Sequence, residues 1–144
     1  MKPFNLDSVL KYRKRLSDQA RNRYQHAQNQ LIEAQEAFDR KNSEWLDLIT
    51  AMVTLEAEGM IVDEHIRYQN RIEFVRAELL KLEETLNKKR AIVVQERKHL
   101  VTKSKEKRVL EKLKEKQNQE YRSYINKKEA TLLDEVAVLH RNQQ

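Results

Sequence analysis

The sequence predicts an all-α protein, an elongated antiparallel coiled-coil hairpin of two helices in which the second helix is longer than the first. Charged residues make up 36% of the 144 residues, a composition typical of long helices and coiled coils. The chain has a single glycine, Gly59, and a single proline, Pro3, so it has the residues for only one chain reversal. Apolar residues recur at spacings of three and four on both sides of Gly59, which favours helices over disorder.

The first helix is expected over about residues 7–58, with Asp7 or Ser8 as its N-cap. Its second half carries a heptad seam of Leu31, Ala34, Phe38, Lys41, Trp45, Leu48, Met52 and Leu55. Its first half has apolar residues at Val9, Tyr12, Leu16, Ala20, Tyr24 and Ala27. Steps of four cluster there, so we expect the seam to drift towards an 11-residue repeat and the supercoil to relax.

The bend is expected at residues 59–62. Gly59 is suited to the left-handed conformation that ends a helix, because it has no side chain to clash with the backbone. Asp63 is the expected N-cap of the second helix. Met60, Ile61 and Val62 lie between them and make the bend more apolar than an ordinary solvated loop.

The second helix is expected over about residues 63–140, so that residues 1–144 form a single hairpin domain. Its seam consists of Tyr68, Ile72, Val75, Leu79, Leu82, Leu86, Lys89, Val93, Glu96 and Leu100, followed by a thinner stretch with Lys103, Lys107, Leu110 and Leu113. Folding the chain near residue 60 pairs positions whose numbers add up to about 121. From about Glu120 onward the second helix then has no partner within the chain, and we expect it to be frayed or to bind another protein.

The charges separate along the predicted hairpin. Residues 11–23 hold six basic residues and one acid, and the opposite segment, 97–116, holds nine basic residues and three acids. Residues 31–62 hold two basic residues and seven acids. The end with both termini is therefore predicted to be basic and the bend acidic, which suits electrostatic docking of the basic end.

The sequence lacks the residues for most catalytic and cofactor chemistry. It has no cysteine, its four histidines are isolated, and one glycine cannot build a phosphate-binding loop. We therefore expect a protein that is not an enzyme and that holds no cofactor and no metal. No apolar run approaches the roughly 20 residues that span a bilayer, and the first residues do not resemble a signal peptide, so a cytoplasmic protein is expected.

Three short motifs resemble the flagellar FliJ family. Residues 4–14, FNLDSVLKYRK, resemble its opening, an apolar-Leu-x-x-Leu stretch that runs into Tyr-Arg and a basic helix. Residues 65–72, HIRYQNRI, resemble the start of its second helix, and residues 133–137, LDEVA, resemble a motif near its C-terminus. The family pattern often has an aromatic residue where this sequence has Arg71, which weakens the match at that surface.

The resemblance implies a non-enzymatic stalk of the flagellar type III export apparatus, cytoplasmic and peripherally associated with the membrane. It implies that the termini enter the pore of a hexameric export ATPase, that the bend reaches the export-gate membrane protein, and that the protein assists export chaperones. The basic residues expected to bind the ATPase are Lys11, Arg13, Lys14, Arg15, Lys103, Lys105, Lys107 and Arg108. The residues expected to bind the export gate are Met52, Met60, Ile61, Tyr68 and Ile72.

Three alternative functions are weighed against this one. A stalk protein of a virulence type III secretion system would share the same architecture. A nucleic-acid-binding protein would suit the net charge of +6, but the basic residues do not gather on one reading helix, so no nucleic acid is expected. A structural coiled coil could oligomerise through the unpaired end of the second helix, whereas the hairpin alone predicts a monomeric rod.

Overall fold

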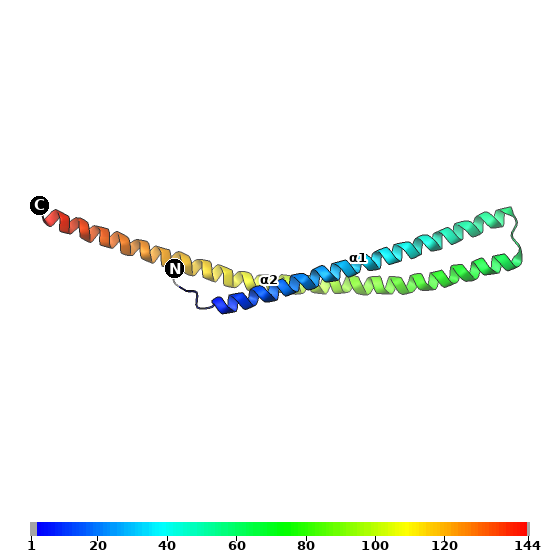
Figure 1. The fold of residues 1–144 in the computed structure, drawn as a ribbon, viewed down its shortest axis with the longest axis horizontal. Helices are drawn as coiled ribbons and strands as arrows, with labels where there is room; N and C mark the ends of the chain where they lie inside the picture. The colour runs from blue at the N-terminus through cyan, green and yellow to red at the C-terminus, as the bar shows by residue number, and fades with distance from the viewer. Residues whose placement is uncertain (1–2, 144) are drawn as a thin grey trace. The chain divides into compact units, whose positions relative to one another are not determined.

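The computed structural model describes residues 3–143 and contains two helices. Helix α1 spans Asp7–Glu58 (52 residues) and helix α2 spans Val62–Asn142 (81 residues). The two helices run in opposite directions and pack against each other, which confirms the predicted all-α class with a longer second helix (Figure 1). Within residues 3–143, neither helix is long and apolar enough to cross a membrane.

Residues Ala20–Leu100 form one compact unit, which contains the bend and the helix segments on either side of it. The seam between the helices is most deeply buried at Val75 and Leu86, and at Ala20 and Ala27 on α1. The other seam positions are half-buried and are those that the sequence predicts: Leu31, Ala34, Phe38, Lys41, Trp45, Leu48, Met52 and Leu55 on α1, and Tyr68, Ile72, Leu79, Leu82, Lys89, Val93, Glu96 and Leu100 on α2.

Polar contacts across this seam show the register directly. Lys41 Nζ lies 2.6 Å from a Glu78 carboxylate oxygen, and Arg23 Nη2 lies 2.9 Å from Glu96 Oε1. Lys89 Nζ donates a hydrogen bond of 3.2 Å to the side-chain oxygen of Gln30. The residue numbers in all three pairs add up to 119, within two of the register predicted from the seams alone.

The second unit combines residues 3–19 with residues 101–143, and its seam differs from the prediction. Val9 and Tyr12 were expected in the seam, but they are 39% and 52% exposed. Leu10 and Ser17 are buried instead, at 2% and 0% exposed, which continues the heptad steps of Ala20–Leu100 without a drift towards an 11-residue repeat.

The heptad persists in this unit because its polar seam residues have partners. The Ser17 and Ser104 hydroxyl oxygens lie 3.5 Å apart, and Arg13 Nη1 lies 2.6 Å from Glu106 Oε2. A buried polar group that finds a partner avoids the cost of desolvation without compensation. On α2 the seam likewise passes through half-buried Lys114 rather than Leu113, which is 45% exposed.

Helix α1 begins one residue earlier than a cap at Asp7 would allow, and α2 begins two residues earlier than a cap at Asp63 would allow. The Leu6 carbonyl accepts a hydrogen bond of 2.8 Å from the Leu10 amide, and the Ile61 carbonyl accepts one of 3.1 Å from the His65 amide. Asp7 therefore lies in the first turn of α1, and Asp63 lies in the first turn of α2, rather than capping them. A carboxylate in the first turn still stabilises a helix, since it faces the positive end of the helix dipole.

The bend occupies residues 59–61, one residue fewer than predicted, because Val62 is already helical. Gly59 has φ = +95°, a conformation that residues with a side chain rarely adopt, and its amide donates a hydrogen bond of 3.3 Å to the Glu56 carbonyl. His65 Nε2 lies 2.8 Å from Glu56 Oε1, so a side-chain contact also joins the two sides of the bend.

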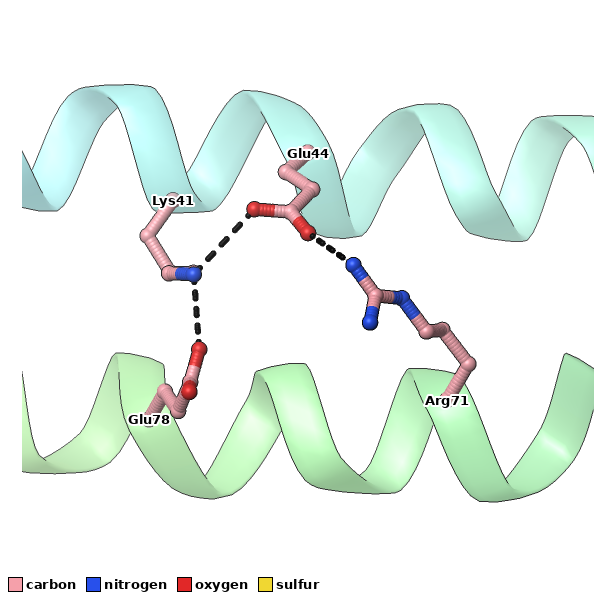
Figure 2. A network of polar contacts seen from close by, with 4 residues as sticks. All are labelled: Lys41, Glu44, Arg71 and Glu78. Atoms are coloured by element: carbon pink, nitrogen blue, oxygen red, sulfur yellow. Dashed lines mark hydrogen bonds and ion pairs between the residues drawn. The ribbon is translucent and has the colours of Figure 1, made fainter.

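A four-residue network crosses the seam in the middle of the acidic segment (Figure 2). Lys41 Nζ contacts Glu78 at 2.6 Å and Glu44 at 3.2 Å, and the other oxygen of Glu44 lies 3.0 Å from Arg71 Nη2. The hydrogen bonds to Glu78 and Glu44 raise the pKa of Lys41, and the hydrogen bond from Lys41 lowers the pKa of Glu44. The network thus gives the charged seam lysine two carboxylate partners.

Replacing Gly59 tests whether its backbone conformation limits stability. We expect Gly59→Ala to lower the free energy of unfolding by about 1 kcal/mol, because no atom lies within 4 Å of an added Cβ and the cost comes from φ alone. Gly59→Asn, which tolerates positive φ better, should cost less. Urea denaturation measures both variants, and equal stability of Gly59→Ala and the wild type would contradict this account of the bend.

The Lys41 network predicts a dependence of stability on pH. The stabilisation from Glu44 is present above the ordinary glutamate pKa of about 4.3 and is lost as the pH falls through the lowered pKa of the folded state. The urea midpoint should therefore fall between pH 7 and pH 3, and it should fall less in Lys41→Gln. Lys81→Gln, at an exposed lysine outside the network, is the control. An equal fall in wild type and Lys41→Gln would rule out this role.

Candidate functional site

The eight basic residues predicted to bind the ATPase come together in the unit formed by residues 3–19 and 101–143. We call them the terminal basic cluster: Lys11, Arg13, Lys14, Arg15, Lys103, Lys105, Lys107 and Arg108. Four lie on α1 and four on α2, and the antiparallel packing brings the two groups side by side (Figure 1). The ion pair of Arg13 with Glu106 joins them directly, across 93 residues of sequence.

Acidic neighbours engage half of the terminal basic cluster. Glu106 Oε2 contacts Arg13 at 2.6 Å and Lys103 at 3.4 Å. Lys107 Nζ lies 3.8 Å from Glu111, and Lys11 Nζ lies 3.4 Å from Asp7. Of these contacts, only the one between Arg13 and Glu106 joins α1 to α2, and the other three lie within one helix.

The other four members of the cluster are exposed: Lys14, Arg15, Lys105 and Arg108. Within residues 3–143 none of them forms an ion pair. They come in equal numbers from α1 and α2, so their charge faces solvent from both helices. The cationic surface open to an anionic partner thus consists of these four side chains.

Asp7 fixes the start of α1 against α2. Its carboxylate lies 3.1 Å from Lys114 Nζ and 3.4 Å from Lys11 Nζ, and the hydrogen bond from Lys114 lowers the pKa of Asp7. One turn further on, Gln117 Nε2 donates a hydrogen bond of 3.2 Å to the Pro3 carbonyl. Residue 3, the first residue that the structure describes, thus lies beside residue 117 of α2.

The sequence did not single out two cations that lie next to the cluster. A shallow pocket of about 330 Å³ beside Leu10 has Lys14, Lys114 and Arg122 in its wall, together with Glu111. Lys114 is the next heptad position after Lys107 and Leu110. Continuing the predicted seam from Leu110 by four residues, instead of three to Leu113, would therefore have identified it. Arg122 lies past the predicted pairing region, and only the structure relates it to Lys14.

Beyond its contact with Pro3 at Gln117, α2 continues as a helix to Asn142. Every residue from 126 to 143 is exposed. The predicted overhang from about Glu120 is therefore present, and it is helical rather than frayed.

The residues predicted to bind the export gate do not form one exposed surface. Met52, Tyr68 and Ile72 are half-buried at seam positions, and Met60 is half-buried in the bend. Only Ile61 is well exposed, at 63%.

Other apolar residues near the bend are more exposed than the predicted ones. Val53, Val62 and Ile66 are 57%, 74% and 48% exposed, and with Ile61 they make what we call the bend apolar surface. Val53 follows the seam residue Met52, and Ile66 precedes the seam residue Tyr68 by two, so both lie outside the predicted seam. Among residues 3–143, no group of three or more histidine or acidic side chains is placed to hold a metal ion.

A family model described as "Flagellar FliJ protein" matches residues 1–144, the whole of the sequence. The chain belongs to the FliJ family. The FliJ family consists of structural, chaperone-like components of type III secretion. The chain is accordingly assigned as a type III secretion stalk protein. The family resemblance predicted from the three short motifs is thereby confirmed.

Two further comparisons add little to the family assignment. No curated protein matches the chain. A solved structure of CT670 from Chlamydia trachomatis, assigned as a YscO homolog, matches over 100% of both chains with 20% identity and a TM-score of 0.39.

Proposed function

We propose that this FliJ-family chain is the stalk of a flagellar type III export apparatus, and that its terminal basic cluster enters the pore of the hexameric export ATPase. The single observation that supports the proposal most strongly is the set of exposed cations on both helices of the terminal unit. In this proposal the bend contacts the export-gate membrane protein and export chaperones are further partners. The protein would act in the cytoplasm, peripherally associated with the membrane apparatus.

The exposed cations suit a pore lined by acidic groups. Lys14, Arg15, Lys105 and Arg108 have no competing ion pair within residues 3–143, so a partner need not displace a carboxylate to reach them. Exposed charges are screened over about 10 Å at 0.1 M ionic strength, so the proposed binding should weaken steeply as salt is added. Arg13 contributes differently, because its contact with Glu106 joins α1 to α2, while Lys103 contacts the same carboxylate from within α2.

The bend is a different kind of surface. Three of the four residues of the bend apolar surface, Val53, Ile61 and Val62, lie in residues 31–62, a segment that holds seven acids and two basic residues. Its contact with the export gate would therefore rest on apolar burial rather than on cations. Of the five residues predicted from sequence, Ile61 is the most exposed and is the one that we propose touches the gate first.

Reversing the four exposed cations tests the ATPase contact. We expect Lys14→Glu, Arg15→Glu, Lys105→Glu and Arg108→Glu combined to weaken binding to the matching export ATPase by roughly thirtyfold at 0.1 M salt. The estimate assumes about 0.5 kcal/mol per exposed ion pair. Pull-down with the purified hexamer and stimulation of its ATPase rate are the measurements.

A second variant of equal charge change provides the control. Arg40, Arg67, Lys81 and Lys88 are exposed in the other unit, and their combined replacement by Glu alters the net charge by the same amount. The control should bind the ATPase at least ten times more tightly than the cluster variant, by the same estimate. If both variants weaken binding equally, or if neither does, pore insertion of the basic end is wrong.

Polar substitution at the bend tests the export-gate contact. Ile61→Asp and Val62→Asn should reduce capture of the chain by the cytoplasmic domain of the export gate severalfold, because they remove exposed apolar area without entering the seam. Val109→Asn, at a similarly exposed valine on the terminal unit, should leave capture unchanged. Unchanged capture of the bend variant would place the gate contact elsewhere.

A further inference from the structure

The seam between the helices is much more polar in the terminal unit, residues 3–19 and 101–143, than within Ala20–Leu100. In Ala20–Leu100 the charged seam residues are Lys41, Lys89 and Glu96, and apolar residues occupy the other seam positions. In the terminal unit the seam positions up to the Pro3 contact are Leu6, Leu10, Arg13, Ser17, Lys103, Lys107, Leu110, Lys114 and Gln117. Three of these are apolar, and one of the three, Leu6, is 41% exposed. Pairing of the helices in the terminal unit therefore gains less from apolar burial.

The polar contacts of the terminal unit replace little of this apolar burial. Arg13 Nη1 lies 2.6 Å from Glu106 Oε2, but the two side chains are 34% and 35% exposed. The pair of Lys114 with Asp7 is more exposed still, at 42% and 40%. Ion pairs this accessible to water add little net stability, because water also solvates the separated charges well. These contacts therefore select the register of the terminal unit more than they hold its helices together.

The charges of the terminal unit also oppose its pairing. Residues 3–19 hold four basic residues and two acids, and residues 101–119 hold seven basic residues and three acids. Both segments are thus net positive, and pairing brings like charges together. In the other unit, residues 20–58 hold four basic residues and seven acids, and residues 62–100 hold nine basic residues and seven acids. The net charges of those two segments are opposite, so they favour pairing.

The first part of α1 depends on this pairing for its helical structure. Residues 7–19 form a segment of thirteen residues, and an isolated helix shorter than roughly 12–15 residues is marginal in water. Once separated from α2, this segment should therefore fray from its start. The apolar seam of Ala20–Leu100 keeps the rest of both helices paired, so fraying need not spread beyond the terminal unit.

We propose that the paired helix ends of the terminal unit open and close as a separate unit while Ala20–Leu100 stays paired, and that neutralising their cations closes them. The sparse apolar seam, the exposed ion pairs and the like net charges all lower the stability of the closed state. Opening of this kind is a local unfolding reaction, with a free energy below that of global unfolding.

The opening has a consequence for binding, which rests on the proposed function. Lys14 and Arg15 on α1 can meet the same anionic partner as Lys105 and Arg108 on α2 only while the helix ends are paired. A partner that contacts both groups neutralises the charges that repel each other. Such a partner binds the closed state better than the open one, so binding and closure favour each other.

Amide hydrogen exchange of the free, full-length chain measures the opening. Relative to their unfolded rates, the amides of residues 11–19 should exchange roughly thirtyfold faster than those of residues 31–55, a difference of about 2 kcal/mol. Raising the ionic strength from about 0.1 M to about 1 M should slow exchange in residues 11–19 severalfold, because the screening length falls from about 10 Å to about 3 Å. Residues 31–55 should not be slowed by salt, because the paired segments there carry opposite net charges.

A disulfide across the terminal unit provides a closed reference state. The Ser17 and Ser104 hydroxyl oxygens lie 3.5 Å apart, and the natural sequence has no cysteine. Ser17→Cys with Ser104→Cys should therefore form a disulfide with little rearrangement. Oxidation should slow exchange in residues 11–19 at least about tenfold and remove its salt dependence, and reduction of the same protein should restore both.

Apolar substitution in the seam provides a second test, which needs no cross-link. Lys107→Leu with Lys114→Leu places apolar side chains at two half-buried seam positions and should slow exchange in residues 11–19 at least about tenfold. Lys105→Leu with Lys112→Leu, at exposed positions of the same helix, removes the same charge without entering the seam. This control should slow exchange no more than about threefold, through weaker repulsion alone. Far-UV circular dichroism checks that all variants stay helical.

Several results would overturn the proposal. They are equal protection of residues 11–19 and 31–55, exchange in residues 11–19 that salt accelerates or leaves unchanged, and exchange that neither the disulfide nor the seam variant slows. Equal effects of the seam variant and its control would contradict the role given to the sparse apolar seam. The measurements use the free chain, so their failure leaves the proposed ATPase contact standing. Conversely, a cluster variant that still binds the ATPase would overturn the proposed function and leave the opening intact.

Discussion

The continuous heptad seam between α1 and α2 is the constraint on which the rest of the molecule depends. Only a few of its positions are fully buried, among them Val75, Leu86 and Leu10, and the others are half-buried. A seam this thin fixes the register weakly by apolar packing alone, since many heptad steps are chemically alike. Charged and polar pairs such as Lys41–Glu78, Arg13–Glu106 and Ser17–Ser104 add the missing specificity, because a slip by one heptad would leave each of them without its partner.

The position of a basic residue relative to the seam determines whether it pairs with an acid or stays exposed to solvent. Where a basic residue lies on or beside the seam, as Arg13 and Lys103 do, an acid on the facing helix or on the following turn of the same helix engages it. Where the heptad turns a basic residue outward, as at Lys14 and Arg108, it stays exposed. The terminal unit thus offers exposed cations alongside the paired helices, and these suit an anionic protein.

Much of the architecture was predictable from local chemistry, because one glycine and two periodic arms leave few other folds. The register was also predictable to within two residues, since both seams are regular on either side of Gly59. The path of the seam through residues 9–17 was not. Hydrophobicity alone favours Val9 and Tyr12 as seam residues over Arg13 and Ser17. The structure shows that Arg13 and Ser17 face Glu106 and Ser104 on α2, and these partners explain why the polar residues occupy the seam. Near the bend, hydrophobicity alone was again insufficient to predict an exposed binding surface. Met52, Tyr68 and Ile72 were predicted to bind a partner, but they occupy seam positions and are half-buried.

Site-specific photo-cross-linking to the hexameric export ATPase tests the central claim, that a FliJ-family chain engages this ATPase through its basic end, most directly. The natural sequence has no cysteine, so a single cysteine can carry the cross-linker at position 15 or 108 in the terminal unit, or at position 61 in the bend. The account predicts strong cross-links from positions 15 and 108 to pore-lining residues, lost at high salt, and none from position 61. Cross-links from position 61 alone, or cross-links from 15 and 108 that are insensitive to salt, would contradict it.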